Sequence, residues 1–105
     1  MPHADRSDRT GSLRYHLQRV IVDMRERAYP PAYFMRALNW PQADEDELLE
    51  QSKALLRNPE GQNAAFEYKR RYPNGLTLED IVVAHGIVLG FDAEDVAIAR
   101  RTLGS

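Results

Sequence analysis

Histidine has the widest chemical repertoire of the residues in this chain, and it occurs three times, as His3, His16 and His85. A helical zinc site needs two histidines one turn apart, as in an HExxH motif, because both rings then project from the same face. No pair of these histidines has that spacing. We therefore predict no metal site, and we expect His85, which lies in an apolar segment, to be a buried structural residue with hydrogen bonds.

Residues suited to nucleophilic or phosphate chemistry also lack the sequence context that such chemistry requires. The chain has no cysteine, and no serine lies in a GxSxG elbow. Gly86 and Gly90 stand outside any GxGxxG or GK[ST] motif. The carboxylates gather at the starts of predicted helices, where capping explains them, and short helices leave little room for a substrate pocket. The sequence predicts a protein that is not an enzyme and needs no cofactor.

Arginine and tyrosine residues in the second half of the chain could form a surface for nucleic acid. Arginine pairs with phosphate in a bidentate manner, and tyrosine stacks on unpaired bases. The alternative is that these cations only stabilise helix C-termini in solvent. The candidate residues are Tyr68, Lys69, Arg70, Arg71, Tyr72, Arg100 and Arg101.

Aromatic and acidic residues in the first half of the chain suggest instead a surface for another protein. Exposed aromatic side chains beside arginine are favoured at protein interfaces, and an acidic patch would complement a basic partner. The alternative is that the aromatic residues fill the core. The candidate residues are Tyr29, Tyr33, Arg36, Asp44, Glu45, Asp46 and Glu47.

Composition places these residues in one small globular domain. The chain has 105 residues, of which 43% are hydrophobic and 29% charged, and its net charge is −2. This balance is typical of a folded domain and does not indicate a general polyanion binder. The N-terminus lacks an apolar run, and the apolar stretch near 81–91 is too short to span a bilayer. We therefore expect a cytoplasmic protein without a membrane partner.

Helical periodicity and capping signals predict the elements that would position the candidate residues. Ser12 can cap a helix that carries one apolar stripe and ends at Pro30-Pro31. The stripe consists of Leu13, Leu17, Val20, Ile21, Met24 and Ala28. A short segment up to Trp40 follows, with Phe34, Leu38 and Trp40 expected in the core. Asp44 and Glu47 then resemble a capping box.

The second half of the chain repeats these signals. Asn58-Pro59 can cap and open a helix, and its apolar side is expected to contain Ala65, Phe66, Tyr68 and Tyr72. Helix starts of the capping-box type follow at 77–80 and 92–95, and Gly90 and Gly104 suit helix ends. The β-branched run within 81–89 leaves a short strand as the alternative there.

Together these patterns predict an all-α fold, a compact bundle of five or six short helices. Residues 1–11 are expected to be a flexible N-terminal tail, and residues 12–105 a single helical domain. We expect a non-enzymatic protein-binding module, that is, a small regulator, inhibitor, adaptor or accessory subunit that acts through a preformed helical surface. A nucleic-acid-binding regulator is the first alternative, and a homo-oligomeric structural protein is the second.

Overall fold

The computed structural model describes residues 12–104, which form an all-α bundle without strands, as predicted. The segment 81–89 is helical, so the alternative of a strand there is wrong. The tail predicted for residues 1–11 lies outside the described part of the chain. The helices are α2 (Leu13–Glu26), α3 (Ala32–Leu38), α4 (Glu45–Arg57), α5 (Pro59–Arg71), α6 (Leu78–Leu89) and α7 (Ala93–Gly104).

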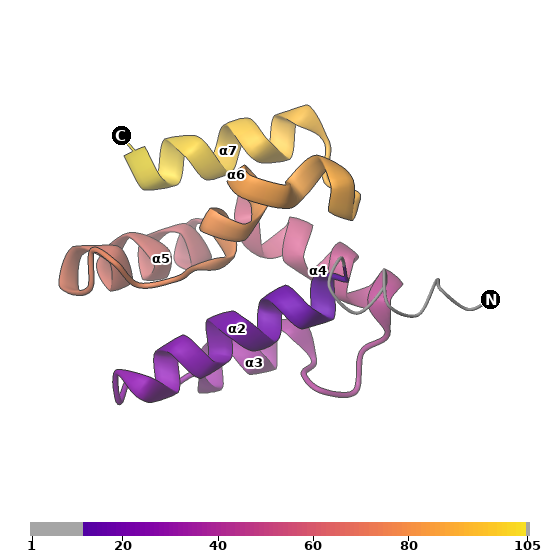
Figure 1. The fold of residues 1–105 in the computed structure, drawn as a ribbon. Helices are drawn as coiled ribbons and strands as arrows, with labels where there is room; N and C mark the ends of the chain where they lie inside the picture. Colours follow the sequence, from indigo (N-terminus) through magenta and orange to yellow (C-terminus); the bar gives the residue numbers. More distant parts are fainter. Residues whose placement is uncertain (1–11, 105) are drawn as a thin grey trace.

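The helices are arranged so that α4 and α5 lie between two outer pairs. In Figure 1, α2 and α3 lie below α4 and α5, whereas α6 and α7 lie above them. Helices α6 and α7 pack closely on each other, and α6 also contacts α2. No helix within residues 12–104 has the length and apolar character needed to cross a membrane.

Side-chain caps begin the helices as the sequence predicts. Ser12 accepts a hydrogen bond from the backbone of Tyr15 at the start of α2. Thr77 and Asp80 form a complete capping box at the start of α6, because each side chain accepts from the other residue's backbone N–H. The predicted box at the start of α4 is only half formed: Asp44 caps Glu47, whose own carboxylate accepts from Asn39 instead.

Helix α2 confirms the predicted apolar stripe but ends earlier than Pro30. Leu17, Val20 and the other stripe residues up to Met24 are buried. The helix ends at Glu26 because Ala28 adopts a left-handed backbone with φ of 58°, and the Tyr29 N–H then donates to the Met24 carbonyl. Ala28 is consequently exposed and does not belong to the stripe.

Two predictions of burial are wrong. Phe66 is 51% exposed, because the inward face of α5 consists of Ala65 and Tyr68, which leaves Phe66 beside the outer groove against α7. His85 is also exposed, although α6 as a whole is apolar. Among the aromatic residues expected in the core, Phe34 is 7% exposed and Trp40 is half-buried against the core.

The start of α7 is fixed by a buried carboxylate. Asp95 is fully buried, and it and Asp92 each accept the other's backbone N–H. An oxygen of Asp95 lies 2.9 Å from Arg57 Nη2, and the other lies 3.8 Å from Lys53 Nζ. These ion pairs join α7 to α4, so the acids that begin α7 serve the fold rather than only facing solvent.

Candidate functional site: an apolar pocket with a buried glutamate

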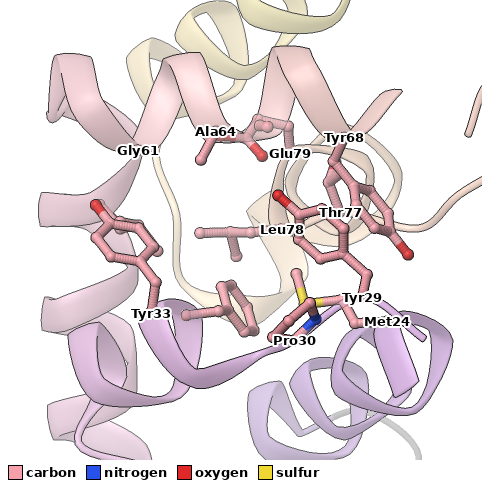
Figure 2. A pocket seen from close by; sticks show the side chains of 13 residues that line it. Met24, Tyr29, Pro30, Tyr33, Gly61, Ala64, Tyr68, Thr77, Leu78 and Glu79 are labelled. Carbon is pink, nitrogen blue, oxygen red and sulfur yellow. The ribbon is translucent and has the colours of Figure 1, made fainter. Parts of the chain in front are cut away.

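A pocket of about 370 Å³ opens between the α2–α3 turn, α3, α5 and the start of α6. This volume falls within the range of small-molecule and side-chain binding sites. Most of the lining is apolar, and Figure 2 shows Tyr29 and Tyr33 on opposite sides with Leu78 between them. The lining residues are Met24, Tyr29, Pro30, Tyr33, Phe34, Leu55, Gly61, Ala64, Ala65, Tyr68, Thr77, Leu78 and Glu79.

Backbone features of the neighbouring elements create this opening. The left-handed Ala28 ends α2 early, so the chain enters α3 through Tyr29 and Pro30 at the rim. At the opposite wall, Gly61 lets α5 approach the end of α4: a Cβ at this position would lie 2.7 Å from the Leu55 carbonyl oxygen. Helix α3 packs against α4, and the space that remains between α3 and α5 is the pocket.

Glu79 is the carboxylate of the pocket. It is the second residue of α6 and is only 3% exposed. Burial raises its pKa from the ordinary 4.5 to about 7, and the negative charge of Asp80 adds to the shift. Hydrogen bonds from its own backbone N–H and from Thr77 act in the opposite direction but do not offset burial. No basic side chain within residues 12–104 forms an ion pair with Glu79.

A second carboxylate, Asp23, lies behind the pocket wall, and its pKa is shifted in the opposite direction to that of Glu79. It accepts the Tyr68 hydroxyl at 2.7 Å, the Leu76 N–H at 2.8 Å and the Arg27 Nε at 3.2 Å. Burial acts to raise the pKa of Asp23, but these hydrogen bonds outweigh it and lower the pKa. The Tyr68 ring lines the pocket, and the hydrogen bond of its hydroxyl to Asp23 fixes the position of the ring in this wall.

The structure brings two of the predicted protein-binding residues together. Tyr29 and Tyr33 are half-buried, and both line the pocket. The pKa of Tyr33 is raised by burial and then by the nearby Glu60 carboxylate, while Arg36 acts in the opposite direction. Arg36 is exposed on α3 and therefore flanks the rim beside Tyr33.

The predicted acidic residues lie elsewhere, at the start of α4. Glu45 accepts the N–H groups of Leu13 and Arg14, and so completes the start of α2. Asp44 caps α4, Glu47 accepts a hydrogen bond from Asn39, and Asp46 is exposed. None of these acids lines the pocket, so the structure does not gather the predicted residues into one site.

The predicted nucleic-acid-binding residues are largely engaged within the protein. Tyr68 is 1% exposed, so its ring is not available for stacking on a base. Lys69 pairs with Asp80 at 3.2 Å, and Arg70 pairs with Glu67 at 2.6 Å. The Arg71 guanidinium lies over the rings of Tyr72 and Tyr29, at 5.2 and 6.0 Å from their centroids. The remaining two residues, Arg100 and Arg101, are exposed on α7.

Two of the three histidines, His16 and His85, form a stacked pair that their spacing in the sequence does not show, and His3 lies outside the described residues. The rings of His16 and His85 lie 4.6 Å apart between α2 and α6, and Arg19 contacts His16 Nδ1 at 3.0 Å. Burial lowers the pKa of His16, and the charges of His85 and Arg19 lower it further. His16 therefore stays neutral near pH 7 and acts as part of the helix packing.

Glu79 is the residue that the sequence interpretation missed, because an acid in the first turn of a helix ordinarily faces solvent. The available signal was its position in a helix that is otherwise almost entirely apolar. The expectation that short helices leave little room for a pocket was also wrong. A buried carboxyl that titrates near neutral pH can either exchange a proton or pair with a cation.

No family model matches the chain, and neither a curated protein nor a solved structure matches it. The function is therefore inferred from the pocket and its residues.

Proposed function

We propose that this protein is a non-enzymatic protein-binding module that receives a side chain of its partner in the pocket between α3 and α5. The observation that carries the proposal is the preformed pocket of about 370 Å³ with Tyr29 and Tyr33 at its rim. Protein interfaces concentrate their binding energy in such anchors, where a side chain fills a pocket and excludes water.

The pocket supplies both the driving force and the geometry for such an anchor. A side chain that buries about 100 Å² of apolar surface gains roughly 2.5 kcal/mol from the hydrophobic effect. The tyrosines offer rigid, amphipathic surface at the rim, and Arg36 adds a charge outside it. Because the Tyr68 wall is held on Asp23 in the free protein, little conformational entropy is lost on binding.

Filling the pocket with a side chain of the protein itself tests the proposal. Ala64 lines the pocket from α5 and is half-buried, so Ala64→Phe should occupy the space that the anchor needs. Ala97 is exposed on α7, and Ala97→Phe is the matched control on a face away from the pocket. Both variants should keep the helical circular-dichroism signal of the wild type.

The measurement is capture of a stoichiometric partner from the native host at low salt and at about 0.5 M salt, where exposed charge pairs are screened. We expect the wild type and Ala97→Phe to retain the same protein at both salt concentrations, and Ala64→Phe to lose it. Equal retention by Ala64→Phe would refute the pocket as the binding site. Retention of nucleic acid that disappears at high salt would instead support the alternative surface at Lys69–Arg71 with Arg100 and Arg101.

A further inference from the structure

Glu79 places a carboxylate in the apolar pocket, and no cationic side chain among residues 12–104 pairs with it. It is 3% exposed and lines the pocket, and Figure 2 shows it above Leu78. Burying a charge without a compensating charge is costly, and a partner that brings the opposite charge removes that cost. The pocket therefore favours an anchor side chain that carries a positive charge as well as an apolar part.

A neighbouring cluster shows one way in which this fold pairs a partly buried carboxylate with a cation. Arg27 Nε lies 3.2 and 3.3 Å from the two oxygens of Asp23, and the Arg27 guanidinium is 5.4 Å from the Tyr72 ring centroid. That cluster combines a carboxylate, a guanidinium and an aromatic ring. The pocket has the carboxylate of Glu79 and the aromatic rings of Tyr29 and Tyr33. Arg71 places a guanidinium 6.0 Å from the Tyr29 ring centroid, but within residues 12–104 no guanidinium pairs with Glu79.

An arginine side chain fits this carboxylate and these aromatic walls better than a lysine or a neutral side chain does. Its planar guanidinium can donate two hydrogen bonds to one carboxylate and stack on an aromatic face. It keeps its proton in an apolar environment, whereas a buried lysine loses its proton readily. Its three-carbon stem can lie along apolar walls, and arginine is one of the residues most enriched at interface anchors.

We propose that the anchor is an arginine of the partner protein, with its stem between Tyr29 and Tyr33 and its guanidinium paired with Glu79. This inference rests on the proposed function, because it names the side chain that enters the same pocket. It is argued from charge complementarity: the pocket has aromatic walls and one buried acid that pairs with no cation in the described part of the chain.

Ionisation of Glu79 then controls the affinity near neutral pH. The titratable groups that share its surroundings are Asp80 on α6, Tyr68 on α5, and Tyr29 and Tyr33 across the pocket. Farther out, Arg71 lies over the Tyr29 ring, and Glu60 and Arg36 act on Tyr33. Tyr33 and Tyr68 have raised pKa values and stay neutral in this range. Asp80 already pairs with Lys69 at 3.2 Å. Because the pKa of Glu79 is about 7, its ionised fraction rises about tenfold from pH 6 to pH 8.

Matched arginine and citrulline probes test this inference on the full chain. N-acetyl-arginine N-methylamide carries the guanidinium, and the citrulline analogue replaces it with a neutral urea of nearly the same shape. The shifts of the Leu78 and Glu79 amide resonances would be followed by NMR while each probe is added. We expect the arginine probe to bind at least about tenfold more tightly than the citrulline probe, and its affinity to rise about tenfold from pH 6 to pH 8.

Two variants separate the pocket acid from the general charge of the rim. Glu79→Gln keeps the shape and removes the charge, so it should bind both probes equally and show no dependence on pH. Glu60→Gln removes an exposed acid near Tyr33 and should change the affinity for arginine less than about twofold.

Equal affinity of the wild type for both probes, or full arginine affinity in Glu79→Gln, would overturn the inference. Absence of any shift with the arginine probe would overturn it as well. The proposed function fails by a different result, namely retention of the partner by Ala64→Phe, so the two failures can be told apart.

Discussion

Asp23 and Glu79 are carboxylates that lie on either side of the Tyr68 wall. They differ in burial, in their hydrogen-bond donors and in the direction of their pKa shifts. Asp23 accepts from three donors, which lie just after α2, in α5 and in the segment before α6. Glu79 is more completely buried, yet its hydrogen bonds come only from its own backbone and from Thr77. The donors lower the pKa of Asp23, whereas burial raises that of Glu79 to about 7.

This difference separates an acid that joins parts of the fold from the acid that we propose pairs with an arginine of a partner. Asp23 joins distant segments and is satisfied within the fold, so its removal should affect stability. The ionised carboxylate of Glu79 destabilises the folded state, and a cationic ligand would offset this effect. Substitution of Glu79 should therefore affect recognition and the pH dependence of stability. Each of the following variants tests one side of this contrast.

The largest effect is expected from Asp23→Ala. The variant leaves the Tyr68 hydroxyl and the Leu76 N–H without their acceptor, and it removes the ion pair with Arg27. We expect a loss of about 3 kcal/mol in the free energy of unfolding, measured by urea denaturation at neutral pH. A loss below about 1 kcal/mol would show that Asp23 is not the structural centre of this cluster.

Glu79→Gln should change stability in a way that depends on pH. The folded pKa of Glu79 is raised, so the folded state holds a proton that the unfolded state has lost between pH 4.5 and about 7, and the wild type loses stability as pH rises through that window. The glutamine variant lacks this loss. Its stability relative to the wild type should therefore increase by about 3 kcal/mol from pH 4 to pH 8, measured by urea denaturation at both. A difference that does not depend on pH would contradict the burial of an ionisable Glu79.

For Asp23 we expect stability to depend on pH in the opposite direction. Its folded pKa is lowered, so its contribution is present above its ordinary pKa of 3.8 and is lost only as the pH falls below that value. Asp23→Asn should therefore lose its difference from the wild type in strong acid. Unfolding midpoints measured from pH 7 down to pH 2 would show whether the two curves converge, and parallel curves would argue against the lowered pKa.

Tyr68→Phe should lower the stability by a smaller amount, through Asp23 alone, and should leave binding at Glu79 unchanged. The ring stays in the pocket wall, while the hydrogen bond of its hydroxyl to Asp23 is lost. We expect a loss of about 1 kcal/mol in the free energy of unfolding by urea denaturation. The preference for the arginine probe over the citrulline probe should be unchanged, since Glu79 is untouched. A loss of that preference would mean that the two carboxylates are not independent.

Local sequence signals predicted the helices well because caps and apolar periodicity act over a few residues. Ser12, Thr77 and Asn58-Pro59 begin α2, α6 and α5 as expected, and Gly90 ends α6 with a left-handed backbone. The early end of α2 was not predicted, because nothing in an alanine signals a positive φ.

The site was predicted only in part, because it depends on contacts between distant segments. Tyr29 and Tyr33 were chosen as exposed aromatics, and both line the pocket. Glu79 was missed because its burial results from packing of the α2–α3 turn and α5 against the start of α6. Tyr68 was expected on the apolar side of its helix, and as a base-stacking residue in the nucleic-acid alternative. It is buried, and its hydroxyl donates to Asp23, 45 residues away in the chain, a contact that no local pattern indicates.

The most direct test of the account is the titration of the Glu79 carboxyl itself, followed by NMR on protein with ¹³C-labelled glutamate and assigned with Glu79→Gln. A buried carboxyl without a cation predicts a midpoint near pH 7, and the arginine probe should lower that midpoint by pairing with the ionised form. A midpoint near the ordinary 4.5 that does not respond to the probe would contradict both the buried state of Glu79 and its role as the receptor for a cation.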